Sequence, residues 1–598
     1  MNINEQANFI WSIADLLRGD FKQSEYGKVI LPFTVLRRFD CVLAPSKAKI
    51  LEANKTLTVS NKRPIFKRMT GHDYYNVSQF DFEKLMDDSN AIEANLRDYI
   101  NGFSEDVREI MDNFEIFGAI DRLSRANLLY LVVQRFAEID MSDTQIDNLE
   151  MGYMFEELIR RFSEQSNETA GEHFTPREVI ELMVEVLLDP DMDEIANTDG
   201  KVITILDPAC GTGGMLSVAQ NKMESLNSTT QVIPFGQELN PETYATCRSD
   251  MILKGNTNSR IVLGNSFNED GFKSQTFDYM LSNPPFGVEW KKVEKFIKDE
   301  AASQGYRGRF GAGLPRISDG SFLFLQHLIS KMNSPEKGGS RIGIVFNGSP
   351  MFSGDAGSGE SEIRRWIIEN DLLEAIIGLP DQLFYNTGIT TYIWILTNRK
   401  ENRRKGKVRL INGAGFFEKM RKGLGNKRNI ISPENRAELV RLYSTYEPDE
   451  NYMDLDKSGY YIETPKTKSG YREIPMSEPV YQALKRVVKN RGKKTTIMID
   501  GYTNFLFLKR DGTPKVGMDY NNMIRNLLKK YNKQHKEPLP NITPHSFRHT
   551  FCTRMANAGM NPKALQYIMG HANITMTLDY YTHVDACSVR AEMERLAA

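Results

Sequence analysis

Val202-Ile-Thr-Ile-Leu-Asp207-Pro-Ala-Cys-Gly211-Thr-Gly213-Gly214-Met215 is the stretch that decides the fold of this chain. Its first half is a run of β-branched and aliphatic residues that predicts a buried strand, and the helix-forming run 215–225 follows the glycines. Glycines let the backbone approach a ligand closely, and the start of a helix offers free N–H groups. The stretch therefore predicts a strand, a loop and a helix that together bind a ligand.

A second motif, Ser282-Asn283-Pro284-Pro285-Phe286, follows the strand-like run 277–282. Both motifs are then expected at carboxyl ends of strands, where open α/β sheets bind ligands. Residues 207–215 together with 283–286 resemble motifs I and IV of the S-adenosylmethionine-dependent amino-methyltransferases that act on DNA. The resemblance implies a Rossmann-like α/β domain that uses S-adenosyl-L-methionine as its cofactor.

The residues of the second motif suit methylation of a nucleobase amine. Such an amine is a poor nucleophile, and two acceptors, the Asn283 side-chain carbonyl and the Pro284 backbone carbonyl, can hold its hydrogens and orient its lone pair. Pro284 and Pro285 stiffen the loop. Phe286 offers a face on which a base flipped out of the duplex can stack. We therefore expect Asn283, Pro284, Pro285 and Phe286 to be catalytic, mainly through positioning.

Upstream, His173-Phe174-Thr175-Pro176 resembles motif X of the same family, which wraps the methionine end of the cofactor. Thr175 before Pro176 is also an ordinary helix start, so a plain cap is the alternative interpretation. The order of motifs X, I and IV is that of the γ class of these enzymes.

Further cofactor contacts are expected after the next two strands. Glu238 ends the second strand, where the Rossmann solution places an acid on the ribose hydroxyls. Asn265 stands where many relatives have Asp, and it would serve the adenine edge of the cofactor. The resemblance thus implies a cofactor-binding set: His173, Phe174, Thr175, Pro176, Asp207, Pro208, Gly211, Gly213, Gly214, Glu238, Asn265 and Ser266.

Residues 1–150 lack glycine clusters and place apolar residues three and four apart, which predicts a helical domain. Segments such as Glu25-Tyr-Gly-Lys-Val-Ile-Leu-Pro32 resemble the N-terminal domain of modification subunits of type I restriction-modification systems. That resemblance implies N6-adenine methylation of double-stranded DNA. It also implies an assembly with a restriction subunit and a specificity subunit, with two methylase subunits per specificity subunit.

Composition separates the end of the chain from the rest. From Gly459 onward 22 Lys and Arg stand against 11 Asp and Glu, a net charge of +11, whereas the preceding residues sum to −13. A basic region attracts phosphates. Five cysteines without metal-ligand or disulfide spacing, and no apolar run near ~20 residues, predict a cytoplasmic protein without a membrane contact and without a metal.

The basic tail resembles the tyrosine recombinases, close to the integrases of conjugative transposons. The resemblance rests on Lys466, His545, Arg548, His571 and Tyr581, in that order. It implies that Tyr581 attacks a DNA phosphodiester, with Arg548 and His571 stabilising the phosphorane, His545 assisting and Lys466 protonating the leaving oxygen, Lys468 being a rival for that last role.

One recombinase part is missing from the sequence. The family uses a second arginine upstream of the segment that contains Lys466, and here that position holds methyltransferase-like sequence. Loss of one such donor costs on the order of 3 kcal/mol by analogy with hydrolases. We therefore expect a catalytically inactive half-recombinase, joined by gene rearrangement, that retains DNA binding through its charge.

The sequence thus predicts four regions: a helical domain (1–150), a Rossmann-like methyltransferase domain (151–400), an appendage and linker (401–457), and a mostly helical, truncated recombinase domain (458–598). The methyltransferase sheet is expected to end with the strand through Leu396. Two alternative functions remain open. One is a site-specific recombinase with an N-terminal accessory domain, and the other is a non-catalytic DNA-binding fusion product.

Overall fold

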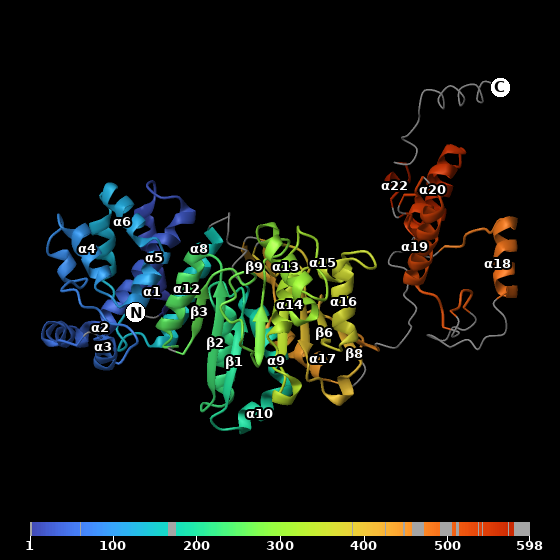
Figure 1. Ribbon diagram of the computed structural model, residues 1–598. Coiled ribbons are helices and arrows are strands. Elements are labelled where there is room, and N and C mark those ends of the chain that lie inside the picture. Colours follow the sequence, from blue (N-terminus) through green and yellow to red (C-terminus); the bar gives the residue numbers. More distant parts are fainter. Residues whose placement is uncertain are drawn as a thin grey trace, which may run out of the picture. The chain divides into compact units, whose positions relative to one another are not determined.

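In a computed structural model of the chain, the described residues are 3–59, 61–165, 175–256, 258–385, 387–424, 426–445, 449–456, 472–490, 505–509, 513–535, 537–540, 542–571 and 573–578. They form two compact units, residues 1–457 and residues 458–598 (Figure 1). Each unit has its own hydrophobic core. We call the first unit the body and the second the tail. Across the described ranges, no helix is long and apolar enough to cross a membrane.

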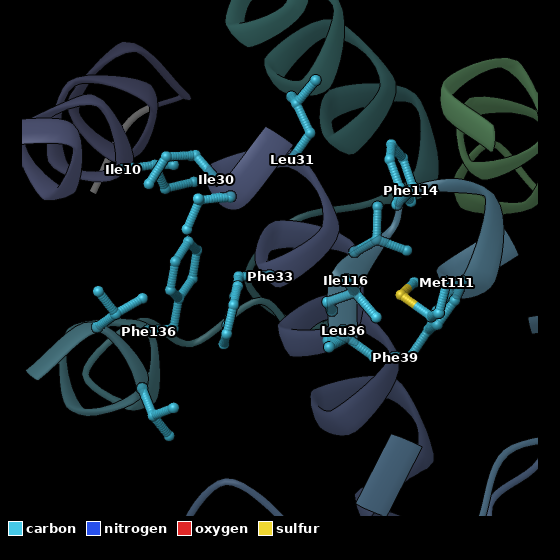
Figure 2. Close-up of a cluster of buried hydrophobic side chains, with 14 of the residues drawn as sticks. Ile10, Ile30, Leu31, Phe33, Leu36, Phe39, Met111, Phe114, Ile116 and Phe136 are labelled. Carbon is cyan, nitrogen blue, oxygen red and sulfur yellow. The ribbon is translucent and has the colours of Figure 1, made fainter. Parts of the chain in front are cut away.

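The body begins with the predicted helical domain. Its helices are α1 (Ile3–Ile13), α2 (Tyr26–Thr56), α3 (Arg63–Thr70), α4 (Ile92–Asn101), α5 (Glu105–Asn113), α6 (Ile116–Arg125), α7 (Leu129–Ala137) and α8 (Asn148–Gln165). Helix α2 is the centre of this domain because apolar residues cover it on most sides, and Phe33 stacks on Phe136 of α7 with ring centroids 5.7 Å apart (Figure 2). The core also takes in Ala245 and Leu253, which belong to a helix of the following domain.

A nine-stranded sheet follows, in the order β11-β8-β6-β7-β5-β4-β1-β2-β3. The strands are β1 (Val202–Asp207), β2 (Gln231–Glu238), β3 (Arg260–Leu263), β4 (Tyr279–Ser282), β5 (Arg341–Phe346), β6 (Leu373–Gly378), β7 (Tyr392–Thr397), β8 (Lys407–Asn412) and β11 (Tyr452–Asp456). Only β7 and β11 run antiparallel to their neighbours. The carboxyl ends of the other seven strands therefore meet at one edge, which we call the carboxyl edge.

Helices cover both faces of this sheet, which confirms the predicted α/β class. They are α9 (Arg177–Leu188), α10 (Met192–Asn197), α11 (Gly214–Leu226), α12 (Pro241–Leu253), α13 (Glu294–Gln304), α14 (Ser321–Ser330), α15 (Ser349–Phe352), α16 (Gly359–Glu369) and α17 (Pro433–Ser444). Ile203 and Ile205 of β1 pack with α9 and α11 on one face, whereas Leu206 packs with α14 and α16 on the other. This alternation is the period of two that strands impose on side chains.

The sheet does not end at Leu396, which differs from the expectation. Strand β8 adds to β6 in parallel, and β11 adds to β8 in antiparallel register, so the expected appendage completes the sheet. Arg409 of β8 reaches Asp454 of β11 at 2.7 Å and secures the last strand. Both strands have short, charged sequences, and β11 is the edge strand, which is paired on one side only. Between them lies a separate hairpin of β9 (Glu418–Leu424) and β10 (Lys427–Ile430).

The described part of the tail is mostly helical, as predicted. Its helices are α18 (Glu478–Asn490), α19 (Gly517–Gln534), α20 (Pro544–Asn557), α21 (Pro562–Met569) and α22 (Thr575–Leu578). Helices α20 and α21 share a small core of four buried residues, namely Cys552, Ala556, Leu565 and Met569. Several apolar side chains of α19 stay exposed, among them Leu527 at 60%.

Candidate functional site

A cavity of about 630 Å³ opens at the carboxyl edge of the sheet, between the loops that follow β1, β2, β3 and β4. That volume is in the range of pockets that hold small molecules and cofactors. Ten of the residues predicted for the site line it: Thr175, Asp207, Pro208, Gly211, Gly214, Glu238, Asn265, Ser266, Asn283 and Pro285. The structure therefore brings together residues that lie more than a hundred positions apart in the sequence.

The glycine loop turns the chain from β1 into α11. Gly211 and Gly213 have φ angles of +55° and +85°, in the left-handed region where side chains are strained. A Cβ atom on Gly213 would lie 2.7 Å from Cys247 Sγ of α12, so no larger residue fits without a shift. The helix start at Gly214 then presents unpaired N–H groups at the cavity wall.

Asp207 connects the two motifs through hydrogen bonds. Its carboxylate accepts hydrogen bonds from the Ala209 backbone N–H and from the Ser282 hydroxyl, both at 3.0 Å. Ser282 immediately precedes Asn283, so this contact fixes the end of β4 against the end of β1. The side chain is buried, and this burial raises the pKa of Asp207 to about 7.

Asn283 projects from the end of β4 with one half of its amide engaged. Its Nδ2 donates to Thr175 Oγ1 at 2.9 Å, whereas its Oδ1 is buried and has no hydrogen-bond partner within the described ranges. An unsatisfied buried carbonyl is costly and indicates a missing ligand atom. Thr175 does not cap α9, because Pro176 takes the N-cap position. The plain-cap interpretation of Thr175 is therefore wrong.

Glu238 is buried at the end of β2, where its two carboxylate oxygens accept the backbone N–H groups of Gly211 and Asn240 at 2.9 and 2.8 Å. Each oxygen keeps a further lone pair for a ligand hydroxyl. After β3, Ser266 donates its hydroxyl to the Pro208 carbonyl at 2.5 Å, and Asn265 accepts the Phe267 N–H at 2.9 Å. These bonds tie three loops of the cavity to one another.

Three aromatic residues that the sequence did not predict for the site, Phe267, Trp290 and Phe324, form an aromatic wall of the cavity. Phe267 and Phe324 both line it, with ring centroids 4.6 Å apart, and Trp290 lies beside them. Phe322, two residues earlier on α14, belongs to the core, whereas Phe324 is only half-buried. The period of helix α14 alone could not separate these two phenylalanines.

Arg309 holds the aromatic wall from behind. Its guanidinium donates to the Ser266 and Phe267 carbonyls at 2.9 and 2.6 Å and pairs with Glu300 at 2.6 Å. It also lies 3.2 Å from Nδ1 of buried His327, and burial lowers the pKa of His327 to about 3. The imidazole is therefore neutral beside the guanidinium. No local motif marked Arg309, because its partners are distant in the sequence.

Another part of the cavity, which we call its charged end, is lined by Glu156 of α8, by Asp250 of α12 and by Lys254, which follows α12. Asp250 and Lys254 form an ion pair at 2.6 Å. Asp250 Oδ1 is buried and has no partner among the described atoms. Burial raises the pKa of Glu156. This end mixes both signs of charge and suits a zwitterionic group.

The remaining predicted residues lie elsewhere. Gly213, Pro176, Pro284 and Phe286 do not line the cavity, and Phe286 packs against the core cluster on the α9 and α11 face of the sheet. His173 and Phe174 lie outside the described residues. Stacking of Phe286 on the flipped base therefore stays a prediction. Contact of His173 and Phe174 with the methionine end of the cofactor also stays a prediction.

Within the tail, the structure describes the side chains of two residues of the predicted recombinase set, Arg548 and His571. Arg548 of α20 donates to the Met569 carbonyl at the end of α21, two residues before His571. His571 Nδ1 lies 2.9 Å from Thr577 Oγ1, and partial burial and the nearby Arg548 lower its pKa. The side chain of His545 and the whole of Lys466 and Tyr581 lie outside the described residues.

Three family models match the chain. The N-6 DNA Methylase model matches residues 146–460, the HsdM N-terminal domain model matches residues 6–136, and the Phage integrase family model matches residues 449–587. The first of these covers more than half of the chain.

Individual relatives divide in the same way. Over 148 residues, the chain is 65% identical to the transposase from transposon Tn916 of Enterococcus faecalis, a match that covers 25% of this chain and 36% of the transposase. The chain thus spans about a third of that relative's length. The body is 26% identical over 471 residues to the type I restriction enzyme MjaIX methylase subunit of Methanocaldococcus jannaschii, covering 76% of this chain and 80% of that subunit.

A solved structure agrees with the fold of the body. The type I restriction-modification system methyltransferase subunit from Streptococcus thermophilus aligns with a TM-score of 0.61 at 22% identity, over 76% of this chain and 96% of that chain. At this identity the likeness concerns the fold alone.

Proposed function

Because this chain belongs to the N-6 DNA methylase family, we propose that its body transfers a methyl group to N6 of adenine in double-stranded DNA. The observation that carries the proposal is the buried Asn283 Oδ1, which has no partner in the described structure and faces a cavity bounded by the glycine loop. An amine hydrogen of the target base would satisfy that oxygen.

The cavity suits S-adenosyl-L-methionine, which supplies an activated methyl group on a sulfonium when bound. Glu238 would accept the ribose hydroxyls, and the Phe267 and Phe324 wall would stack on the adenine ring. The zwitterionic methionine end fits the charged end of the cavity at Asp250 and Lys254.

The residues of this chain then act by orientation. Thr175 accepts from Asn283 Nδ2, so the amide is held with its carbonyl toward the cavity rather than its amine. The Asn283 and Pro284 carbonyls would each accept one hydrogen of the adenine amine, which turns the nitrogen lone pair toward the methyl group. Asp207 and Ser282 keep the end of β4 in register with the glycine loop. Rate enhancement of this kind comes from positioning.

We further propose that the body works as the modification subunit of a type I assembly, with a specificity subunit and a restriction subunit as partners and two methylase subunits per specificity subunit. The match of residues 6–136 to the HsdM N-terminal domain supports this proposal. The tail follows β11 in the sequence. We propose that it has no recombinase activity, because the first arginine of the recombinase set is absent.

The test is tritiated methyl transfer from S-adenosyl-L-methionine to duplex DNA, with and without a specificity subunit, followed by separation of the nucleosides. We expect N6-methyladenine from the parent chain and a loss of at least ~100-fold in Asn283→Ala, as for loss of one preorganised polar contact. Asn333→Ala is the matched control, because Asn333 also donates one 2.9 Å hydrogen bond but lies at the opposite edge of the sheet. Retained transfer in Asn283→Ala would refute the proposal, and N4-methylcytosine as product would refute its choice of base.

A further inference from the structure

The β9–β10 hairpin, residues 418–430, has no role in the proposed chemistry. It follows β8, whose carboxyl end lies at the carboxyl edge of the sheet, together with the end of β4 that bears Asn283. The hairpin forms a two-stranded sheet of its own and adds no strand to the main sheet. It is therefore placed at the functional edge without completing the core.

The hairpin is anchored to the surroundings of the site. Lys427 of β10 forms an ion pair with Glu178 in the first turn of α9 and donates to the Leu383 carbonyl at 2.9 Å. Glu178 lies three residues after Thr175, which contacts Asn283. The hairpin is therefore attached to the same helix start that orients the reactive amide.

A second set of bonds fixes the hairpin to the loop after β6. The backbone N–H groups of Asn426 and Arg428 donate to the Tyr385 and Gln382 carbonyls at 2.8 and 2.9 Å. Asn429 donates its side-chain amide to the Asp381 carbonyl at 3.0 Å. These contacts hold β10 rigidly while its alternate residues, Arg428 and Ile430, remain exposed.

The charge of this hairpin opposes that of the body. It carries five Lys and Arg and one Glu, whereas the residues before Gly459 sum to −13. Lys427 is buried in its ion pair, but Lys419, Arg421 and Arg428 are exposed. Arg428 also donates to the Lys427 carbonyl at 3.0 Å, whereas the side chains of Lys419 and Arg421 form no hydrogen bond or ion pair with the described residues.

We propose that the β9–β10 hairpin contacts the phosphate backbone of the DNA substrate beside the base that enters the site, through Lys419, Arg421 and Arg428. This inference rests on the proposed function, because DNA is the substrate only if the body is a DNA methyltransferase. A rigid basic β-ribbon is a shape that DNA grooves accept. Backbone contacts of this kind position the protein on the duplex and carry no sequence information.

The experiment is a salt titration of binding to a fluorescent duplex by the full chain, which keeps the contribution of the basic tail constant. The variant is K419Q/R421Q/R428Q. Each lost phosphate contact lowers the slope of log K against log salt by about 0.9, so the slope should fall by roughly 2 to 3. The matched control is K337Q/K405Q/K407Q, which removes the same charge from exposed lysines at the opposite edge of the sheet and should leave the slope unchanged.

Two further readouts separate this inference from the proposed function. Binding of S-adenosyl-L-methionine should be the same in the variant and the parent, and K419R/R421K/R428K should restore the parent slope. An unchanged slope in K419Q/R421Q/R428Q overturns the inference. If binding of a specificity subunit is lost at the same time, the hairpin is a protein interface instead. Failure of the proposed function would instead appear as absence of methyl transfer by the parent chain, whatever the slope.

Discussion

The body and the tail both carry the ordered motifs of a DNA-processing enzyme, yet they support those motifs very differently. In the body, Asp207 and Glu238 are buried at strand ends, and each accepts two hydrogen bonds that join neighbouring loops. In the described tail, Arg548 lies on α20 and His571 follows the end of α21, and the core that these two helices share has four residues. A motif becomes a site only when a scaffold fixes its side chains before the ligand arrives.

The largest effect should come from filling the tightest place in the body. Gly213→Ala would put a Cβ 2.7 Å from Cys247 Sγ at a φ of +85°, so the glycine loop must shift. Strain on the order of 1–3 kcal/mol would weaken binding of S-adenosyl-L-methionine roughly 10- to 100-fold, measured by calorimetry. Gly200→Ala is the control, because it has a φ of +67° but open space around its Cβ. Equal affinity in Gly213→Ala and the parent would break the argument that the loop is preorganised.

A smaller loss is expected when the support behind the cavity is weakened. Arg309→Lys removes donors to the Ser266 and Phe267 carbonyls, and at about 1 kcal/mol per hydrogen bond the affinity for the cofactor should fall roughly tenfold. Turnover at saturating cofactor should change less than the KM for it. Arg37→Lys is matched, because Arg37 also donates to two carbonyls and a carboxylate, but in the helical domain. Similar loss of cofactor affinity in both variants would mean that Arg309 acts only through general stability.

The buried Asp207 side chain predicts that the stability of the body depends on pH. Since the pKa of Asp207 is raised to about 7, above its unfolded value, folding favours the protonated form. The body should therefore gain stability as the pH falls from 8 through 7 toward 5, by about 2–3 kcal/mol from this group. Asp207→Asn should lack this gain. Thermal melts of both proteins at pH 8 and pH 5 give the difference, and parallel pH profiles would contradict the assignment.

The smallest effect should follow from removing the tail. Because residues 1–457 and 458–598 form separate compact units with separate cores, a stop codon after Lys457 should shift the melting temperature of the body by no more than about 1 °C. Methyl transfer per molecule should also be unchanged. A large destabilisation of the truncated chain would show that the two units depend on each other.

Much of the body could be predicted because its signals are local. The β-branched run 202–207 and the glycines after it lie in one strand and one loop, and the second strand, predicted to end at Glu238, is β2. Thr175, Glu238 and Asn283 were expected near the ligand, and all three line the cavity. Residues that follow strands of a parallel sheet meet at one edge, so this convergence follows from topology.

The rest of the site depends on contacts that the sequence does not encode locally. Arg309 and Ser266 lie 43 positions apart, and Lys427 and Glu178 lie 249 apart. Phe322 and Phe324 look alike in the sequence, but only Phe324 lines the cavity. Strands β8 and β11 were missed because their sequences are short and charged, and because a hairpin and a helix separate β11 from β8 in the sequence. Tertiary pairing decides such elements.

The most direct measurement reads both units in one preparation of the full chain. Tritiated S-adenosyl-L-methionine and a nicked suicide duplex are added together with a specificity subunit, and the products are counted as methylated adenine and as covalent protein–DNA adduct. The account predicts methylation that disappears in Asn283→Ala and no adduct at Tyr581. Absence of methylation, together with an adduct that disappears in Tyr581→Phe, would contradict it and make the tail the working enzyme.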